Sequence, residues 1–474
     1  MKSRIIRILF FGLCAWFWFC PMVWGDEFIQ APCVIHVSSS ISDGKYAPEE
    51  IAKIAQDNGI SVLIITDNAA SRFEYGLRPL RGLIKKTMEN PSVLTYGIEN
   101  YLERIKKLNQ EFPKMIFIPA VEGAPFYYWT GSFFKNNLTM HNWHNHILAI
   151  GLDSAAAYRN LPLISNPRGL RAGIRISKFW PVMLILLGLF VLRRKRALGF
   201  FIAVIGLVFL ANNWPFYGLK YDQYHGDAGI MPYQNFIDYV GQLGGLTFWA
   251  HPEAQNLQDF GSIKIETKDQ AVKLAQSQDY TGFAILLEGY KSVGPPGGLW
   301  DEILAQYCAG LRKKPVWAIA ELNRDYQGNL DVFMKELRNM LLVRGLTYPE
   351  VIDALKKGRM YVAQGENAPE FILDRFIIRD LETGNRATLG EELAAKGWVR
   401  LEISGRFLHP ETERIEIKLI KNGSVIKVYE VLSPFEIFYE EETVQGQDKD
   451  YYRLEIRSKD LFVVTNPIFV DKRY

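Results

Sequence analysis

The stretch Val34–Asn68 reads VIHVSSSISDGKYAPEEIAKIAQDNGISVLIITDN, and it decides the fold of the chain around it. A short apolar run that ends at His36 predicts a strand, and the sequence Ser42-Asp43-Gly44 predicts a turn. Pro48 to Gly59 has a helical pattern that begins with proline. The apolar run Val62–Ile65 then predicts a second strand. We therefore expect a strand, turn, helix, strand unit with polar side chains at the far end of each strand.

The polar positions of this unit resemble the opening motif of the PHP (polymerase and histidinol phosphatase) superfamily, which has the form H-x-H, S-D-G, P-E-E and T-D-H. The matching segments are His36-Val37-Ser38, Ser42-Asp43-Gly44, Pro48-Glu49-Glu50 and Thr66-Asp67-Asn68. Two histidines of the motif are replaced, by Ser38 and Asn68. The resemblance extends over about Val34–Gly365. It implies a distorted seven-stranded β/α barrel that holds up to three metal ions and hydrolyses phosphoesters.

The composition is that of a globular protein with two or three domains: 474 residues, of which 48% are hydrophobic and 23% charged. The formal net charge of +3 is small for this length. The chain has no basic stripe interleaved with aromatic residues outside one short run, so we do not expect nucleic acid as a partner.

Apolar runs of four to seven residues alternate with helical patterns, which favours about seven parallel strands that are buried on both faces. In a β/α barrel the carboxyl ends of the strands form one face, and that face carries the chemistry. Polar residues follow five of these runs directly, and His146 precedes another. The five residues are His36, Asn68, Glu122, His251 and Glu321. We expect them to converge on one rim.

The resemblance implies which residues hold metal. The first metal position corresponds to His36, Ser38, Glu122 and Glu321, and the second to Glu122, His146 and His251. The third depends on positions that here are Asn68 and Asn323. Imidazole and carboxylate bind zinc, iron and manganese well, whereas Ser and Asn are weaker ligands for zinc. We therefore expect one or two divalent ions, zinc, manganese or iron, and an empty third position.

Glu122, His251 and Asp43 are the candidate catalytic residues, with Glu122 as the natural bridge between two ions. Asp43 is expected to be an outer ligand or to orient a histidine. His141 and His144 lie in the aromatic segment before His146. One interpretation is a separate metal site that uses His144 and His146, and the favoured one is that only His146 enters the centre. The aromatic rings of this segment, including Trp129, are candidates for a membrane interface.

Two segments are typical of membrane proteins. Residues 1–25 have a basic start and a short apolar core, which predicts either a cleaved signal peptide or an uncleaved anchor. Between 178 and 217, two uncharged apolar arms flank Arg193-Arg194-Lys195-Arg196. They predict a transmembrane hairpin whose basic turn is cytoplasmic and whose flanks are outside the cytoplasm. The alternatives are a hairpin that dips into one leaflet and a pair of core helices.

From Phe371 onward, apolar and charged residues alternate, which predicts strands with one wet face. Asn422-Gly423 favours a tight hairpin turn. We predict an antiparallel β-sandwich domain at 369–474, after the barrel at 30–368. Its Asn466–Val470 segment resembles the end of the β module that follows the barrel in some PHP proteins. Cys33 and Cys308 are candidates for a disulfide only in an oxidising compartment.

Two functions agree with these features. The first is a membrane-tethered, extracytoplasmic, metal-dependent phosphoesterase that acts on a small phosphorylated substrate. The alternative is a catalytically inactive PHP-like barrel that binds a ligand or partner at the lipid bilayer, because part of the ligand set is lost. A transporter has little support, since the two apolar arms contain no charged residue that marks a pathway.

Overall fold

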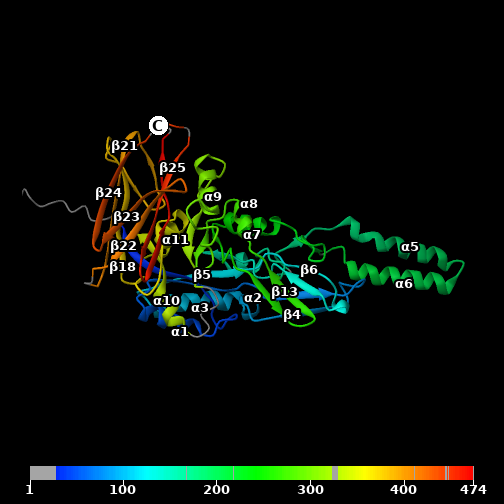
Figure 1. Ribbon diagram of the computed structural model, residues 1–474. Helices are drawn as coiled ribbons and strands as arrows, with labels where there is room; N and C mark the ends of the chain where they lie inside the picture. The colour runs from blue at the N-terminus through cyan, green and yellow to red at the C-terminus, as the bar shows by residue number, and fades with distance from the viewer. Residues whose placement is uncertain are drawn as a thin grey trace, which may run out of the picture.

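The structure is a computed structural model of the chain, and it describes residues 28–166, 168–216, 218–322, 329–409, 412–443, 446 and 448–472. The predicted signal peptide or anchor at 1–25 and Asn323 lie outside these residues. Figure 1 shows an α/β body with an antiparallel β part at one end and a helical hairpin projecting from the other. A mixed α/β fold with separate antiparallel sheets is therefore confirmed.

Seven strands of the body lie where apolar runs predict them. They are β1 (Ile29–Val37), β2 (Val62–Asn68), β5 (Ile116–Gly123), β8 (Ile147–Ile150), β11 (Leu246–Trp249), β14 (Gly282–Leu286) and β15 (Trp317–Ala320). They are neighbours in one sheet, in the order β15-β14-β11-β8-β5-β2-β1. Most of their side chains are buried, which agrees with strands covered on both faces.

Strand β8 departs from the predicted parallel arrangement, because it runs antiparallel to both of its neighbours, β5 and β11. An apolar run of four residues does not reveal its direction. Its first residue, Ile147, pairs with Gly123 and with Trp249, near the carboxyl ends of β5 and β11. His146, which precedes β8, is therefore carried to the same edge as residues that follow parallel strands.

Helix α1 (Pro48–Asp57) shows why the P-E-E sequence begins a helix. Pro48 is in the first turn, where its fixed φ suits a helix and its missing N–H is not needed. The Glu50 carboxylate accepts a hydrogen bond from the Ala47 N–H at 2.7 Å. The longer helices of the body are α1, α3 (Ile98–Glu111), α7 (Met231–Gln242), α9 (Leu299–Cys308) and α11 (Tyr348–Lys357). The shorter ones are α2 (Val93–Tyr96), α4 (Ala155–Arg159), α8 (Ala271–Gln276) and α10 (Leu330–Glu336).

The large sheet continues beyond β1. It runs through β16 (Leu337–Val343) and β17 (Met360–Gln364) to β26 (Leu461–Thr465), β25 (Asp450–Ser458), β22 (Arg414–Lys421) and β23 (Ser424–Leu432). One sheet thus crosses the domain boundary predicted at 368. At the other edge, the described residues form no ladder between β15 and β1. The Leu322 N–H nevertheless donates to the Ile35 carbonyl at 2.9 Å, so the two strands approach each other. Barrel closure stays a prediction.

A second sheet covers the far part of the large one. It contains β19 (Arg386–Thr388), β18 (Phe371–Asp380), β21 (Gly397–Phe407) and β24 (Phe435–Thr443), while β20 (Glu392–Ala394) pairs with β27 (Ile468–Asp471). Side chains of both sheets, such as Leu401 and Ile417, share one hydrophobic cluster, as two packed sheets do. The predicted hairpin turn is confirmed: Asn422 and Gly423 have φ of 49° and 81° between β22 and β23.

Smaller sheets flank the body: β12 (Asn256–Asp259) with β13 (Ile263–Thr267), β7 (Leu138–His141) and β6 (Tyr128–Thr130), then β3 (Arg72–Gly76) with β4 (Lys85–Glu89), and β9 (Arg171–Ala172) with β10 (Gly218–Leu219). Trp129 in β6 is buried, and its indole N–H donates to the Glu74 carbonyl at 2.9 Å. The expectation that Trp129 rests at a membrane interface is therefore wrong. Cys33 and Cys308 are free and buried, so they form no disulfide here.

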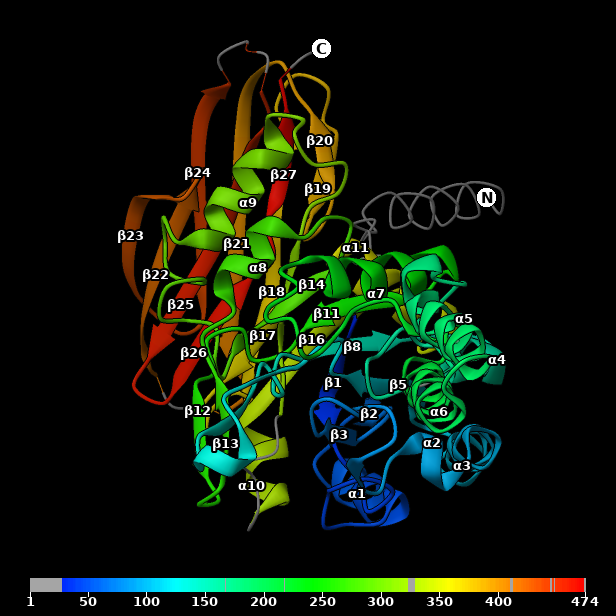
Figure 2. The same ribbon diagram turned by 90° about the vertical axis from the view of Figure 1, so that its right-hand side faces the viewer.

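The predicted hairpin consists of α5 (Trp180–Leu192) and α6 (Arg196–Asn213), which project together from the body (Figures 1 and 2). Apart from Pro181, their buried residues are glycines, at 188, 199 and 206. A Cβ added to Gly188 would lie 2.5 Å from the Ala203 backbone nitrogen, so the two helices touch through their backbones. Such small-residue contacts are common between membrane helices. By length and composition α6 is long and apolar enough to cross a membrane, and α5 is shorter.

A buried ion pair joins the antiparallel part to the body. Arg453 in β25 donates from Nε to Asp301 Oδ1 at 3.0 Å and from Nη2 to Asp301 Oδ2 at 2.8 Å, and Asp301 belongs to α9. Both side chains are almost fully buried. We predict that Asp301→Ala lowers the free energy of unfolding by about 3–5 kcal/mol, because it leaves the Arg453 charge buried without its main partner. Denaturant unfolding of the full chain in detergent measures this.

The matched control is Asp374→Ala. It breaks the exposed pair with Arg406, whose atoms are 3.2 Å apart. Its expected cost is less than about 1 kcal/mol. Equal losses for the two variants would contradict the assignment of Asp301 as the connection between the two parts.

Candidate metal centre

His36 lies in β1 at a β-bulge, where the pairing with β2 shifts register. Its φ of 71° is rare for a residue with a side chain, and such backbone strain gathers at functional sites. The Nδ1 atom of His36 is 2.6 Å from the hydroxyl oxygen of Thr66. This contact fixes the ring, and the opposite nitrogen, Nε2, lies 3.3 Å from the Glu122 carboxylate.

Glu122 occupies the end of β5, and its Oε1 atom is approached from two sides. His36 Nε2 is 3.3 Å away and His146 Nδ1 is 2.6 Å away. His146 reaches it because β8 is antiparallel. One carboxylate oxygen thus stands between two imidazoles from different strands.

His251 follows β11 and Glu321 follows β15, so the same edge of the sheet carries both. The Glu321 Oε1 atom accepts a hydrogen bond from the His251 backbone N–H at 2.7 Å and lies 3.4 Å from its ring Nδ1. The other oxygen, Oε2, lies 3.9 Å from His36 Nε2. His251 has a φ of 30°, a second strained backbone position in the cluster.

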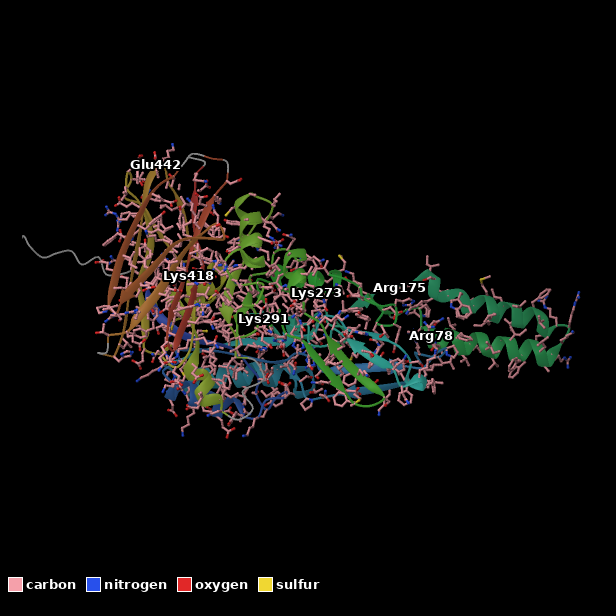
Figure 3. All side chains as sticks on the ribbon, in the orientation of Figure 1. Arg78, Arg175, Lys273, Lys291, Lys418 and Glu442 are labelled. Carbon is pink, nitrogen blue, oxygen red and sulfur yellow. The ribbon has the colours of Figure 1, made fainter. Side chains whose placement is uncertain are left out.

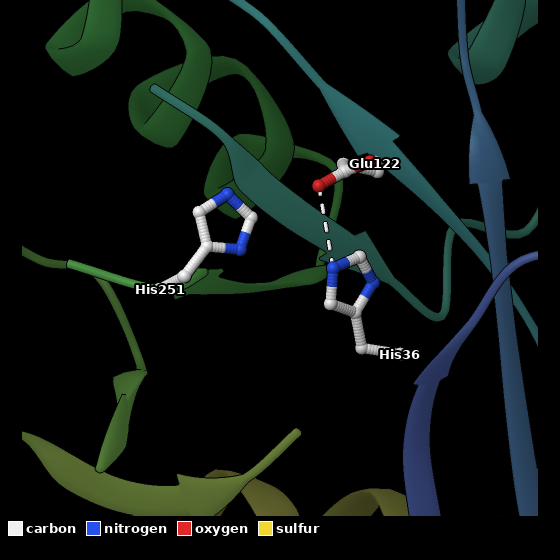
Figure 4. Close-up of side chains that lie close together, drawn as sticks. All are labelled: His36, Glu122 and His251. Carbon is white, nitrogen blue, oxygen red and sulfur yellow. Dashed lines mark ion pairs between the residues drawn. The ribbon is translucent and has the colours of Figure 1, made fainter. Parts of the chain in front are cut away.

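One ligand atom from each of His36, Glu122 and His251 lies within 4.8 Å of the other two, and all three side chains are buried (Figure 4). Among the described residues, four atoms of the cluster take part in its ion pairs without a hydrogen bond of good geometry: His36 Nε2, His146 Nδ1, His251 Nδ1 and Glu321 Oε2. Buried polar atoms without a hydrogen bond are rare and call for an explanation. Imidazole nitrogens and carboxylate oxygens that converge in this way fit a divalent cation.

The charges of the cluster are strongly coupled. Burial by itself raises the pKa of Glu122, but the neighbouring charges of His146 and His36 outweigh it and hold this pKa well below its usual value. Burial lowers the pKa of His251, yet Glu321 outweighs it and raises that pKa to about 9. For His36, burial is again opposed, by Glu122 and Glu321, and the pKa is raised. The metal-free cluster thus binds protons where a metal would sit.

All five predicted metal ligands meet at this edge of the sheet: His36, Glu122, His146, His251 and Glu321. The tightest group combines His36 from the predicted first position with His251 from the predicted second. Among the described residues, the ligand atoms of this group are close enough together to hold one ion. Their role as ligands stays a prediction.

Asp43 is exposed on the loop after β1, where it accepts a hydrogen bond from the Ser42 hydroxyl at 3.3 Å. Thr66 occupies the position against His36 Nδ1 that a histidine-orienting residue would hold. The catalytic role of Asp43 therefore stays a prediction. Asn68 pairs with Glu122 in the ladder between β2 and β5, so the lost third ligand position borders the centre.

The remaining residues of the opening motif have a structural role. Asp67 is fully buried and accepts hydrogen bonds from the Ser39 N–H at 2.8 Å, the Ser39 hydroxyl at 2.7 Å and the Ser42 hydroxyl at 2.6 Å. A Cβ on Gly44 would lie 2.1 Å from the Ser38 carbonyl oxygen, so only glycine fits there. Sequence reasoning missed Thr66 and Asp67 as supports of the site, although the T-D pair at the end of β2 was a signal.

The neighbouring histidines separate from one another. His141 is 3.0 Å from Glu266 and 2.7 Å from the Thr130 hydroxyl, in the β6–β7–β13 sheet. His144 lies closer to the centre: its ring centroid is 5.8 Å from that of His146, and its carbonyl oxygen is 3.2 Å from His251 Nε2. A separate site built on His144 and His146 stays an alternative.

The chain matches no protein-family model and no curated protein. Among solved structures it is similar to a protein from Bacteroides vulgatus ATCC 8482 that is described as a two-domain protein containing a predicted PHP-like metal-dependent phosphoesterase, with 11% identity, a TM-score of 0.35, and 91% of each chain covered. It is also similar to a protein from Bifidobacterium adolescentis ATCC 15703 that is described as a putative metal-dependent phosphoesterase, with 13% identity, a TM-score of 0.23, and 53% of this chain and 76% of that one covered. At these TM-scores neither likeness carries weight, and the site rests on the chain's own residues.

We predict that Thr66→Val weakens metal binding about 10- to 100-fold, because the residue that orients a ligand histidine is lost while the side-chain volume is kept. Competition with a chromophoric chelator measures the affinity. Thr247→Val, at another buried strand threonine, is the control and is expected to bind like the wild type. Equal affinity of all three proteins would contradict the orienting role of Thr66.

Metal affinity is also expected to rise with pH. In the metal-free protein His251 keeps its proton up to its pKa of about 9, and a metal binds only the neutral ring. Manganese affinity should therefore increase about tenfold per pH unit for each proton displaced, and level off above pH 9. Titrations between pH 6.5 and 9.5 test this. An affinity that is constant over that range would show that no protonated imidazole is displaced.

Proposed function

We propose that the protein is a membrane-tethered, extracytoplasmic, metal-dependent phosphoesterase of the PHP type. The observation that carries the proposal is the buried convergence of His36, Glu122 and His251, whose ligand atoms lie within 4.8 Å of one another. His146 and Glu321 stand beside them and complete the set of donors. The opening motif of the sequence supports the same family independently of this geometry.

A divalent ion bound at such a centre supplies a Lewis acid for a phosphoryl oxygen and lowers the pKa of bound water to about 7. The chain's own residues would do the rest. His36, Glu122 and His251 hold the site, and Thr66 fixes the His36 ring. Glu122 has a low pKa, so it stays ionised at neutral pH and is able to orient an attacking water as a hydrogen-bond acceptor. Its position between two imidazoles prevents it from turning away.

The substrate class follows from the same chemistry. A divalent ion held at this site would offset the charge of a small phosphorylated compound, which is the substrate class that we propose. Asp43 is retained as an outer residue, because its loop is held next to β1 by the hydrogen bonds of Asp67.

Tethering is supported by the α5–α6 hairpin. Its surface is apolar and exposed: Met183 is 73% exposed and Phe200 is 66% exposed. An apolar surface of this kind is costly in water and favourable in lipid. The basic turn Arg193–Arg196 between the helices favours a cytoplasmic tip and an extracytoplasmic body, and the basic residues Arg175 and Lys178 before α5 oppose this orientation.

A second candidate function has its own observation. Ser38 and Asn68 replace two histidines of the family motif, so the chain is alternatively an inactive PHP-like barrel that binds a ligand or partner at the membrane. The metal would then have a structural role, or a role in binding.

Turnover separates the two candidates. The purified full chain, loaded with manganese or zinc, is expected to hydrolyse members of a panel of phosphomonoesters and phosphodiesters. Glu122→Gln and His251→Ala should each reduce kcat/KM at least about 100-fold, since each removes a group that holds the reacting site. Glu266→Gln, which affects the carboxylate beside His141, is the control and should leave the rate unchanged. A metal-loaded chain that turns over no ester supports the inactive barrel.

A further inference from the structure

Basic side chains gather where the hairpin leaves the body. Figure 3 shows Arg78 and Arg175 at this end of the molecule, at the base of the two helices. Arg78 and Arg81 belong to the loop between β3 and β4, Arg175 and Lys178 precede α5, and Lys220 follows β10. We call these five residues the cationic collar: Arg78, Arg81, Arg175, Lys178 and Lys220.

The β3–β4 loop is fixed against the end of α6. The Gly82 N–H donates to the Asn212 side-chain oxygen at 2.8 Å. A Cβ on Gly82 would lie 2.2 Å from the Asn212 carbonyl oxygen, so the loop approaches the helix more closely than any side chain permits. Arg78 and Arg81 are thus held at the hairpin base, although they are distant from the hairpin in sequence.

The collar has little negative charge to balance it. The sequence contains no Asp or Glu between Glu74 and Glu89, and none between Asp153 and Asp222. Within the described part of the chain, four collar residues form no ion pair: Arg78, Arg81, Lys178 and Lys220. Arg175 donates to the Lys220 carbonyl oxygen at 2.8 Å, which binds the two segments together. The nearby carboxylate of Asp222 is 2.8 Å from His225, and its charge also acts on Arg81 and Lys178.

Arg81 shows how this charge is held. Its guanidinium carbon lies 4.1 Å from the centre of the Tyr224 ring, and its Nε atom is buried with no hydrogen-bond partner among the described residues. Burial, together with the charge of Arg78, lowers the pKa of Arg81. A cation that is partly desolvated and crowded by another cation gains most from an anion brought to it.

Aromatic rings lie at the same end of the hairpin as the collar. Trp180 begins α5, and Trp214 and Phe216 follow α6. All three are exposed, at about half of their surface. Tryptophan and other amphipathic rings prefer the boundary between lipid tails and headgroups. The collar therefore lies at the height where a bilayer would present its headgroups to the body.

The hairpin is also long enough to reach from one headgroup layer of a bilayer to the other. Helix α6 has 18 residues and spans about 27 Å, close to the roughly 30 Å of a hydrocarbon core. The basic turn Arg193–Arg196 is at its far end, and the collar is at its near end. The collar and the basic turn are thus separated by the apolar length of α6.

We propose that the cationic collar binds the anionic headgroups of phospholipids in the leaflet next to the body. The proposal rests on the insertion of the hairpin, which belongs to the proposed function above. It adds the class of lipid, the residues that contact it and the depth at which the body stops. The body would then be held against the membrane surface, with its metal centre at a fixed height above it.

Electron spin resonance of spin-labelled lipids tests the collar. The full chain is reconstituted in phosphatidylcholine nanodiscs, and the fraction of immobilised label is compared for phosphatidylglycerol and phosphatidylcholine. We expect a preference of about threefold or more for phosphatidylglycerol at low salt, and a smaller one at 1 M salt. In the double variant Arg78→Gln/Arg175→Gln the preference should fall by at least half.

The control is Lys418→Gln/Lys459→Gln, which removes the same charge from the antiparallel part far from the hairpin, where Figure 3 shows Lys418. Its preference should equal that of the wild type. If the chain stays in nanodiscs but immobilises both lipids equally, the proposed lipid binding by the collar is wrong, whereas the membrane insertion of the hairpin still holds. If the chain does not enter nanodiscs at all, the hairpin insertion fails and the collar fails with it. A loss of preference in the control variant as well would show unspecific charge attraction and also overturn the collar.

Discussion

The arrangement of the site depends on two carboxylates, Glu122 and Glu321, which are buried at the end of the central sheet. A buried carboxylate is costly unless opposite charges or donors surround it. Here imidazoles from three strands provide them, and two of these residues, His36 and His251, have strained backbone conformations. Backbone strain of this kind gathers at functional sites, and the cluster of imidazoles and carboxylates could hold a metal ion.

The sheet makes the convergence possible. The strands on either side of β8 deliver Glu122 and His251 at their carboxyl ends, and the reversed direction of β8 brings His146 to the same edge. The residues of the opening motif have two different roles. Asp67 and Gly44 shape the loop after β1, whereas His36 faces the centre. Asp67 and Gly44 therefore support the fold through contacts that do not involve the two replaced histidine positions.

Much of this arrangement could be predicted from the sequence, because apolar runs and the residues that end them are local signals. The seven strands and the meeting of His36, Glu122, His251 and Glu321 followed from such runs. The direction of β8 could not, since four buried apolar residues look the same in either direction. The grouping of His36 with His251 depends on how the sheet curves, which no spacing encodes. Trp129 was misread because an aromatic segment suits a core as well as an interface, and its indole N–H found a partner inside.

The metal content of the full chain, purified without chelator and examined by X-ray absorption at the metal edge, tests the central claim most directly. The account predicts about one divalent ion per chain with at least two imidazole nitrogens and carboxylate oxygen in its first shell, and loss of that signal in His36→Ala and Glu122→Ala. A chain that holds less than about 0.1 ion, and that zinc, iron and manganese all fail to restore, would contradict it.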